Sequence, residues 1–395
     1  MGLLQKLPRK TWSFLNVINR IVRKDPYRIM LYSNMGFRDN VRAVFDYLIQ
    51  NGYNKRYKII VSLNDHKKYS ETPEKNVEYV SPVKGLFKFF RCKYCYYCFG
   101  KYPIKPPKNQ FVFNLFHGMP LKRIGNMVPG CEKIDYNYFS LVLCTSEYFR
   151  DIIKRSFNAS DEQIAICGQP RTDEMLAEIA PEDEMNAKAE LIDYDSRFSK
   201  MILWLPTYRD GRGSELDILE TRSLNKLDKM LSDNGYVMLV KLHPLSTTDP
   251  YMASSTLKCI RVIDNDTLEK SRIGFYSLLA MSHALITDYS SVFFDYVLLD
   301  RPIGFVIDDI KEYSRDRGFV FDDPLSNMPG ELIRSSEDFL GFVKDVIDGR
   351  DKLMNYRRML CSRFNAFNDA DNCKRVVSVI DVNERRLKRK NKHDI

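Results

Sequence analysis

Four features are missing from this sequence, and each absence excludes a class of protein. No apolar run approaches the roughly 20 residues that a helix needs to cross a bilayer. The Gly-x-x-x-x-Gly-Lys-Ser/Thr loop of P-loop nucleotidases and the Gly-x-Ser-x-Gly turn of serine hydrolases are both absent. The N-terminal stretch also lacks the cleavage site of a signal peptide, and Asn16, Asn19 and Arg20 interrupt its apolar residues. We therefore expect a cytoplasmic, globular protein.

Net charge is absent from most of the chain. The total is +9, but residues 1–25 hold six Lys or Arg against one acid, and residues 384–395 hold six against two, so the residues between them sum to zero. An enzyme of nucleic acids more often spreads basic charge along a groove, so we expect no nucleic-acid partner. Basic ends instead suit an anionic membrane surface, which predicts a peripheral location at the inner face of the cell membrane.

Cysteine is present, but its pattern favours neither disulfides nor metal. Nine is an odd number, and reduced thiols are expected in the cytoplasm. Cys92, Cys95 and Cys98 have a spacing that a metal or an iron–sulfur cluster could use, but no fourth Cys or His follows at a motif spacing. Tyr and Phe surround these residues, so a buried strand is the preferred interpretation and no metal ligand is predicted.

Short apolar runs alternate with helical patterns along the chain. Residues 11–24 predict an amphipathic helix with a basic end, which either lies in a membrane interface or packs on the body of the protein. Strands are predicted at 27–32, 57–63, 77–80, 94–99, 111–116, 141–144, 163–167, 200–205, 236–242, 260–263, 284–286 and 302–306. This alternation predicts an α/β fold with mostly parallel sheets that are covered on both faces.

The length of the chain predicts two domains. An acidic, Ala-rich stretch at 178–198 marks the expected boundary. The predicted organisation is a basic amphipathic segment (1–25), a first Rossmann-like domain (26–180), a second Rossmann-like domain (198–350), C-terminal helices (351–383) and a basic tail (384–395).

Polar residues follow five of the predicted strands. These stretches are His117 to Lys122, Gly168 to Arg171, Pro206 to Asp210, Lys241 to Pro244 and Asp288 to Ser291. Doubly wound folds bind ligands at the carboxyl ends of their strands. Cations and oriented N–H groups at this edge would neutralise a diphosphate, and a His would accept a proton from an attacking hydroxyl.

Each of these residues also has a purely structural interpretation. A His after a strand is often a hydrogen-bonded structural residue. Arg171 could pair with Asp173, and Arg209 with Asp210, as ordinary ion pairs. Lys241 could be a solvated charge at the end of a strand.

The stretch from Ala284 to Leu299 predicts a strand, a tight turn and a helix. Ser290 and Ser291 stand where that helix is expected to begin, where unpaired N–H groups and the helix dipole favour an anion. The alternative is that Asp288 or Ser290 only caps the helix. Asp295 follows Ser291 by one turn, so it could reach the same ligand.

These residues lie in motifs that resemble the CDP-glycerol glycerophosphotransferases of teichoic acid and related capsule synthesis. The motifs are His117-Gly-Met-Pro-Leu-Lys122, Thr145-Ser-Glu-Tyr148, Gly168-Gln-Pro-Arg-Thr-Asp173, Leu205-Pro-Thr-Tyr-Arg-Asp210, Lys241-Leu-His-Pro244, Ile286-Thr-Asp-Tyr-Ser-Ser-Val292 and Arg301-Pro302. The resemblance implies a GT-B-like fold, with an acceptor-side and a nucleotide-donor Rossmann-like domain facing a cleft and C-terminal helices crossing back. It also implies transfer of glycerol phosphate from CDP-glycerol to a hydroxyl of a growing teichoic-acid-like or capsular polymer, with release of CMP.

The resemblance assigns roles to individual residues. His117 matches the general base of the family, and His243 is expected to hold the diphosphate as charge passes to CMP. The donor-binding set is Gly118, Met119, Pro120, Leu121, Arg171, Pro206, Thr207, Arg209, Lys241, Leu242, Asp288, Ser290, Ser291 and Asp295. Met119 stands where many members have Thr, so no hydroxyl is available there.

Three alternatives stay open. The donor could be CDP-ribitol, because the motifs do not separate the two polyols. A GT-B glycosyltransferase that uses a nucleotide sugar has the same fold. A non-catalytic protein that binds membranes or polyanions would explain only the basic termini.

The acceptor is expected to be lipid-linked or a polysaccharide. The sequence requires no cofactor, although Asp288 or Asp295 could accept Mg²⁺ that arrives with the diphosphate.

Overall fold

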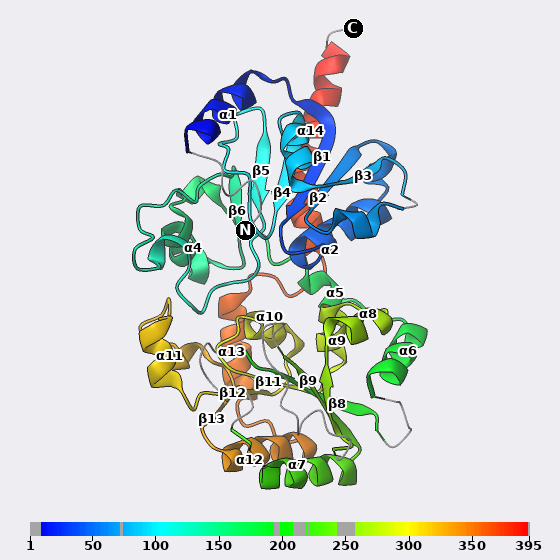
Figure 1. Cartoon of the computed structure of the whole chain (residues 1–395), viewed down its shortest axis with the longest axis vertical. Coiled ribbons are helices and arrows are strands. Elements are labelled where there is room, and N and C mark those ends of the chain that lie inside the picture. Colours follow the sequence, from blue (N-terminus) through cyan, green and yellow to red (C-terminus); the bar gives the residue numbers. More distant parts are fainter. Residues whose placement is uncertain are drawn as a thin grey trace. The chain divides into compact units, whose positions relative to one another are not determined.

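Two parallel sheets form the protein, each in a unit of its own (Figure 1). The computed structural model describes residues 9–71, 74–192, 198–207, 218–219, 221–242 and 257–393. Unit 1 runs to Met119 and also contains residues 124–173 and the chain from Asn365. Unit 2 contains residues 120–123 and 174–364. The acidic stretch at 178–198 therefore lies inside unit 2, and the division falls a few residues before it.

Unit 1 is built around a seven-stranded sheet in the order β3-β2-β1-β4-β5-β6-β7, in which all paired strands are parallel. The strands are β1 (Asp25–Ser33), β2 (Lys58–Leu63), β3 (Val77–Val80), β4 (Cys92–Tyr97), β5 (Phe111–Asn114), β6 (Leu141–Cys144) and β7 (Ile164–Ile166). The last five residues of β1 and of β2 are all buried. Such continuous apolar strands are typical of a parallel sheet with helices on both faces.

The helices of unit 1 are α1 (Arg9–Ile21), α2 (Asp39–Gln50), α3 (Pro82–Phe89), α4 (Arg150–Phe157) and α14 (Asn372–His393), with α5 (Thr172–Leu176) at its boundary. Short 3₁₀ helices are η2 (Tyr53–Lys55), η3 (His66–Tyr69), η4 (Gly125–Met127), η5 (Glu147–Phe149) and η6 (Asp161–Gln163). The last helix, α14, belongs to unit 1 and packs against α2 (Figure 1). The predicted return of the C-terminal helices is therefore confirmed.

Unit 2 has a six-stranded parallel sheet in the order β10-β9-β8-β11-β12-β13. Its strands are β8 (Lys200–Leu205), β9 (Tyr236–Lys241), β10 (Ile260–Ile263), β11 (Ala284–Thr287), β12 (Ile303–Val306) and β13 (Glu331–Ile333). Its helices are α6 (Pro181–Ile192), α7 (Thr221–Asp233), α8 (Asn265–Lys270), α9 (Phe275–Met281), α10 (Phe293–Tyr296), α11 (Ile310–Asp316), α12 (Ser336–Ile347) and α13 (Met354–Phe364), with 3₁₀ helices η7 (Val297–Leu299) and η8 (Leu325–Asn327). Trp204 of β8 packs on Phe339 of α12 in the buried core, with the centres of the two rings 4.8 Å apart.

All twelve predicted strands are present, so the predicted α/β class is confirmed. In each unit the strand order reverses beside the first strand, between β1 and β4 and between β8 and β11. A reversal of this kind opens a crevice at the carboxyl ends of the two strands, where doubly wound folds bind ligands. The two crevices of the units therefore receive the residues that follow β1, β4, β8 and β11.

One predicted element differs from the structure. The helix that was expected to begin at Ser290 and Ser291 begins instead at Phe293, and Val292 is its N-cap residue. It has four residues, continues as the 3₁₀ turn η7, and ends at Asp300, which adopts a left-handed conformation with φ of +50°. The two serines lie in the turn before this short helix, so the prediction that they begin it is wrong.

The amphipathic helix α1 is attached to unit 1 by buried polar groups. The amide of Asn19, which is fully buried, donates to Gln110 Oε1 at 2.8 Å, and Lys24 Nζ donates to the carbonyls of Asn19 and Phe90 at 2.7 Å each. Burial lowers the pKa of Lys24 to about 8. The helix therefore packs on the body of the protein through one face. Among the helices that the structure describes, none has the length and apolar character needed to span a bilayer.

Asp173 holds the first turn of α14, and its removal should destabilise unit 1. Its carboxylate accepts the N–H groups of Asn372 at 2.9 Å and Cys373 at 2.7 Å. We expect Asp173→Ala to lower the free energy of unfolding by about 1–2 kcal/mol, because two N–H groups at a helix start lose their acceptor. Urea denaturation followed by circular dichroism measures this. Asp46→Ala removes a more exposed carboxylate that pairs with Arg42, so it should cost no more than about 0.5 kcal/mol. Equal losses in both variants would contradict the assignment.

Candidate functional site

His117 stands at the carboxyl end of the unit 1 sheet, just after β5. Its imidazole stacks on the ring of Phe99, with ring centres 4.9 Å apart and planes at 21°, and it lies 4.2 Å from the tilted ring of Phe116. Phe99 follows β4, so two neighbouring strand ends supply the rings that hold the imidazole. In the part of the chain that the structure describes, no hydrogen bond to either ring nitrogen is present. The nitrogens are therefore open to a ligand.

The surroundings of His117 favour the neutral imidazole. Burial lowers its pKa to about 4, the charge of Asp39 raises the pKa, and the charge of Arg171 lowers it. The residue as a whole is nevertheless exposed to solvent, although Phe99 stacks on the imidazole and Phe116 lies beside it. Water that reaches this residue weakens the effect of burial on the pKa. A neutral imidazole at pH 7 can accept a proton, as a general base must.

Arg171 is buried beside His117 and is held in part by two residues outside the motifs, Asp39 and Asn40. Its Nη1 donates to Asp39 Oδ2 at 2.7 Å and to the backbone carbonyl of His117 at 2.8 Å. Its backbone N–H donates to Asn40 Oδ1 at 3.1 Å. The alternative pairing of Arg171 with Asp173 is wrong, since Asp173 bonds to the start of α14 instead. The acid that pairs with Arg171 is 132 residues away in the sequence, which no local pattern reveals.

The stretch after His117 is buried. Gly118 has a φ of +122°, a conformation that side chains rarely adopt, and Met119, Pro120 and Leu121 are all buried. The backbone carbonyl of Leu121 accepts the N–H of Val320 at 3.0 Å within unit 2. The main chain at Gly118, rather than the apolar side chains that follow, is thus the part of this stretch suited to approach a ligand.

In unit 2 the residues after β8 and β11 bond to each other. Asp288 Oδ2 accepts both the backbone N–H and the hydroxyl of Thr207, each at 2.8 Å. The two strands are parallel neighbours, and Thr287 pairs with Leu205 in register, so the next residues of both strands meet at the carboxyl edge. Pro206, which stands between Leu205 and Thr207 in the chain, is buried. Asp288 therefore fixes the turn that leads to Ser290 and Ser291, which are half-buried.

The other predicted donor residues of unit 2 have separate positions. Asp295 is buried and accepts a hydrogen bond from the hydroxyl of Tyr276 at 3.2 Å. Lys241 ends β9, next to β8, and its Nζ donates to Asn265 Oδ1 at 2.8 Å; Leu242 beside it is half-buried. Arg209 and His243 lie outside the described residues.

Cys92, Cys95 and Cys98 belong to the core, as predicted. Cys92 and Cys95 lie on the buried strand β4, and Cys98 follows it. The thiol of Cys98 donates to the carbonyl of Phe116 at 3.0 Å, and burial raises its pKa. The interpretation of this stretch as a buried strand is confirmed.

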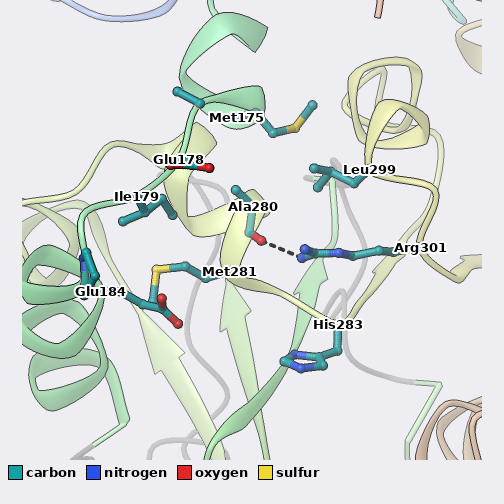
Figure 2. Close-up of a pocket in the computed structure, with 11 residues that line it drawn as sticks. Met175, Glu178, Ile179, Glu184, Ala280, Met281, His283, Leu299 and Arg301 are labelled. Carbon is teal, nitrogen blue, oxygen red and sulfur yellow. Dashed lines mark hydrogen bonds between the residues drawn. The ribbon is translucent and has the colours of Figure 1, made fainter. Parts of the chain in front are cut away.

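A cavity of about 680 Å³ lies beside the amino ends of β11 and β12, away from the carboxyl edge. Figure 2 shows Glu178 and Ile179 on one side of it and Arg301 on the other. Arg301 Nη1 donates to the carbonyls of Ala280 at 2.5 Å and of Ser282. The cavity contains none of the predicted site residues. Arg301, although part of a quoted motif, joins the end of α9 to the start of β12.

A parallel sheet in each of two units, with polar groups gathered at the carboxyl edge of each sheet, defines a GT-B-like α/β protein. The sequence model of one family, CDP-Glycerol:Poly(glycerophosphate) glycerophosphotransferase, matches residues 14–381. The chain belongs to this family and is an enzyme of the glycerophosphotransferase class, as the motifs predicted.

Relatives of known name support this family assignment, and solved structures support the fold. The teichoic acid poly(glycerol phosphate) polymerase of Bacillus spizizenii is 28% identical over 353 residues, which cover 83% of this chain and 83% of that protein. The teichoic acid poly(ribitol-phosphate) polymerase of the same organism is 26% identical and covers 87% of this chain, which spans 55% of its length. The solved structure of the wall teichoic acid polymerase TagF has a TM-score of 0.74 at 22% identity, covering 95% of this chain and 94% of that one. This likeness confirms the predicted GT-B-like fold.

The rings around His117 should set its pKa. We expect NMR titration of the protein with ¹³C-labelled histidine to give His117 a pKa well below the ordinary value of about 6.5. Phe99→Ala should raise this pKa toward the ordinary value, because one face of the imidazole then meets water. Phe87→Ala removes an exposed Phe on α3 and should leave it unchanged. A His117 resonance that titrates near 6.5 in the unaltered protein would contradict this account.

Proposed function

We propose that the protein transfers glycerol phosphate from CDP-glycerol to a hydroxyl of a growing teichoic-acid-like or capsular polymer, with release of CMP. The observation that carries the proposal is the place of His117 at the carboxyl edge of the sheet in a glycerophosphotransferase-family enzyme, where two rings pack beside it and, among the described residues, neither ring nitrogen has a hydrogen bond. The donor is inferred from the family to which the chain belongs and from a solved structure of a TagF variant with CDPG. The acceptor is lipid-linked or a polysaccharide.

The reaction needs one displacement at phosphorus. The acceptor hydroxyl oxygen attacks the β-phosphorus of CDP-glycerol, and a new O–P bond forms. The bond from this phosphorus to the oxygen shared with CMP breaks, and CMP leaves with the electron pair. The hydroxyl proton passes to a ring nitrogen of His117 and then to solvent. Most of the rate enhancement in phosphoryl transfer comes from positioning and charge neutralisation, so one base is sufficient.

Unit 2 supplies the groups proposed to hold the leaving nucleotide. The turn fixed by Asp288 and Thr207 presents Ser290 and Ser291, whose hydroxyls can donate to phosphate oxygens. Lys241 adds positive charge at the end of the adjoining strand. His243 and Arg209 are assigned to the same task by resemblance alone. In all of these roles the groups counter the charge that builds up on the departing CMP.

Donor-borne Mg²⁺ is a further element of the proposal. Asp288 and Asp295 are the carboxylates proposed to meet it. Asp288 Oδ2 already accepts two hydrogen bonds from Thr207, and Asp295 accepts one from Tyr276. The ion would therefore be held mainly by the diphosphate and would share these oxygens with existing donors.

CDP-ribitol is the second candidate donor. A ribitol-phosphate polymerase is among the relatives. Met119 is buried, and it offers no hydroxyl that could help to distinguish the two polyols. Offering CDP-glycerol, CDP-ribitol and a panel of nucleotide sugars to the purified protein separates these donors and also tests the glycosyltransferase alternative.

We also propose that α1 lies against the cytoplasmic face of the membrane. Phe14, Val17 and Ile21 recur on one face of the helix and are 64%, 55% and 77% exposed. Exposed Arg20 and Arg23 flank Ile21, the last residue of the stripe. Apolar side chains with basic neighbours suit the interface of an anionic membrane.

The exposed apolar side chains of α3 support the same surface. Val83 and Phe87 stand one turn apart on that helix and are 39% and 69% exposed. Lys24 links the ends of the two helices, since its Nζ bonds to the carbonyls of Asn19 and Phe90. Isolated exposed apolar residues are ordinary, but two such stripes at joined helix ends indicate an interaction surface.

His117 and Ser291 should affect different kinetic constants. We expect His117→Ala to lower kcat for CMP release about 10²- to 10⁴-fold while CDP-glycerol still binds, because the acceptor loses its base. Ser291→Ala should raise the KM for the donor about tenfold with little change in kcat, since a hydrogen bond to a charged phosphate is lost. Steady-state assays of CMP release measure both. Unchanged turnover in His117→Ala would sink its role as base, and CMP release from no CDP-polyol would sink the proposed reaction.

The α1 stripe should control membrane binding. Replacing Phe14, Val17 and Ile21 together with Ser should weaken partitioning to phosphatidylglycerol vesicles about 100-fold, because each apolar side chain contributes roughly 1 kcal/mol or more at the interface. Vesicle sedimentation measures this, and CMP release from a soluble acceptor should persist. A variant with Met185→Ser and Met359→Ser removes exposed apolar side chains from α6 and α13 and serves as the control. Equal binding by both variants would refute the assignment.

A further inference from the structure

Asp39 and Asn40, at the start of α2, bond to the backbone and side chains around His117, although neither belongs to a motif. Asn40 is fully buried and Asp39 is partly buried. Asp39 has a φ of +63°, and Phe116, directly before His117, has a φ of +52°. Residues other than Gly rarely adopt this left-handed conformation, and it persists where surrounding bonds require it.

Asn40 joins two strand ends to α2. Its Nδ2 donates to the carbonyls of Leu115 at 3.1 Å and Phe116 at 3.2 Å, and to Gln169 Oε1 at 2.6 Å. Its Oδ1 accepts the backbone N–H of Arg171 at 3.1 Å. The ends of β5 and β7 are thus tied to the same buried amide, which fixes the backbone on both sides of the site.

The carboxylate of Asp39 accepts hydrogen bonds from groups around His117. Its Oδ2 accepts Arg171 Nη1 at 2.7 Å, and the same Nη1 donates to the carbonyl of His117 at 2.8 Å. Its Oδ1 accepts the N–H of Asn40 at 2.7 Å and lies 3.6 Å from the thiol of Cys98. A short chain of charge-assisted bonds therefore runs from the carboxylate of Asp39 through the guanidinium to the backbone of His117.

The bonds that hold His117 reach its backbone, and its imidazole is held by packing. Two rings hold its faces, and within the described residues its nitrogens have no hydrogen bond. The backbone carbonyl of His117 is therefore the polar group through which the protein fixes the residue. A guanidinium that is itself fixed by Asp39 can hold this carbonyl, whereas a mobile one cannot.

We propose that Asp39 is a positioning residue for the transfer reaction: it fixes Arg171, which holds the backbone of His117 so that the imidazole meets the acceptor hydroxyl. This inference rests on the proposed function, because it takes His117 as the base. It also gives Arg171 a role in addition to donor binding, since one of its nitrogens is committed to Asp39 and to His117.

A purely structural role for Asp39 makes a different prediction. If Asp39 were needed only to adopt its left-handed conformation, Gly would replace it without loss, because Gly adopts a positive φ freely. Asn also tolerates this conformation and keeps the Oδ1 atom, but it removes the charge. Asp39→Gly and Asp39→Asn together therefore separate the backbone from the carboxylate. Asp46→Asn is the matched control, since Asp46 lies on the same helix and pairs with Arg42 at the surface.

We expect both Asp39 variants to lower kcat about 10- to 100-fold, because small displacements of a catalytic group have effects of this size. The KM for CDP-glycerol should stay within about threefold, and Asp46→Asn should match the unaltered enzyme. Normal kcat in Asp39→Gly would overturn the proposal. A raised KM with normal kcat would also overturn it, since Asp39 would then serve donor binding. Thermal unfolding establishes that each variant is folded at the assay temperature.

A second measurement does not depend on activity. In ¹³C-histidine NMR spectra, the His117 signal should shift in Asp39→Gly and Asp39→Asn and stay in place in Asp46→Asn. An unmoved His117 signal in both Asp39 variants would overturn the positioning role, whatever the reaction is. Absence of CMP release from any CDP-polyol in the unaltered enzyme, together with the expected signal shifts, would instead mean that the proposed reaction is wrong and that the structural link stands.

Discussion

The parallel direction of every strand that the structure describes is the constraint on which the rest of the molecule depends. Parallel strands all end at one edge of their sheet, so each loop that follows a strand delivers its polar groups to the same place. In unit 1 this edge receives Asp39, Phe99, His117 and Arg171 from the ends of four strands. The burial of both sheet faces has a cost, because polar groups at that edge must find partners within the loops themselves. The network around Asn40 and the bonds between Thr207 and Asp288 meet this demand.

The strands could be predicted from the sequence because buried parallel strands are continuous apolar runs. The exception, β13, has three residues and begins with Glu331, which gives too short a pattern to detect. The helix after β11 was placed too early for a related reason. Serine suggests a helix start by its hydrogen-bonding capacity, but the turn that Asp288 fixes extends through Ser291, and the apolar positions of the short helix begin only at Phe293.

The site could be predicted only in part. Strand-end position selected His117, Thr207 and Asp288, because this criterion follows directly from the fold. It could not select Asp39 and Asn40, which look like ordinary polar residues at a helix start, or the pairing of Arg171 with Asp39. A charged side chain has several acceptors within a few residues, and tertiary structure alone decides among them. Sequence also could not predict that burial would lower the pKa of the imidazole, since this depends on two rings that the ends of neighbouring strands bring beside it.

The buried bonds of Lys24 and Asn19 have a consequence for the outer surface of the protein. An amphipathic helix on a globular body is free, in principle, to roll about its axis until its apolar stripe is covered. The bonds of Asn19 to Gln110 and of Lys24 to Phe90 fix the rotation of α1, because rolling would leave these buried groups without partners. Polar residues beneath the helix therefore keep Phe14, Val17 and Ile21 turned outward. Buried bonds fix the orientation of α1, so the exposed residues of this helix can be replaced without changing how it packs on the protein.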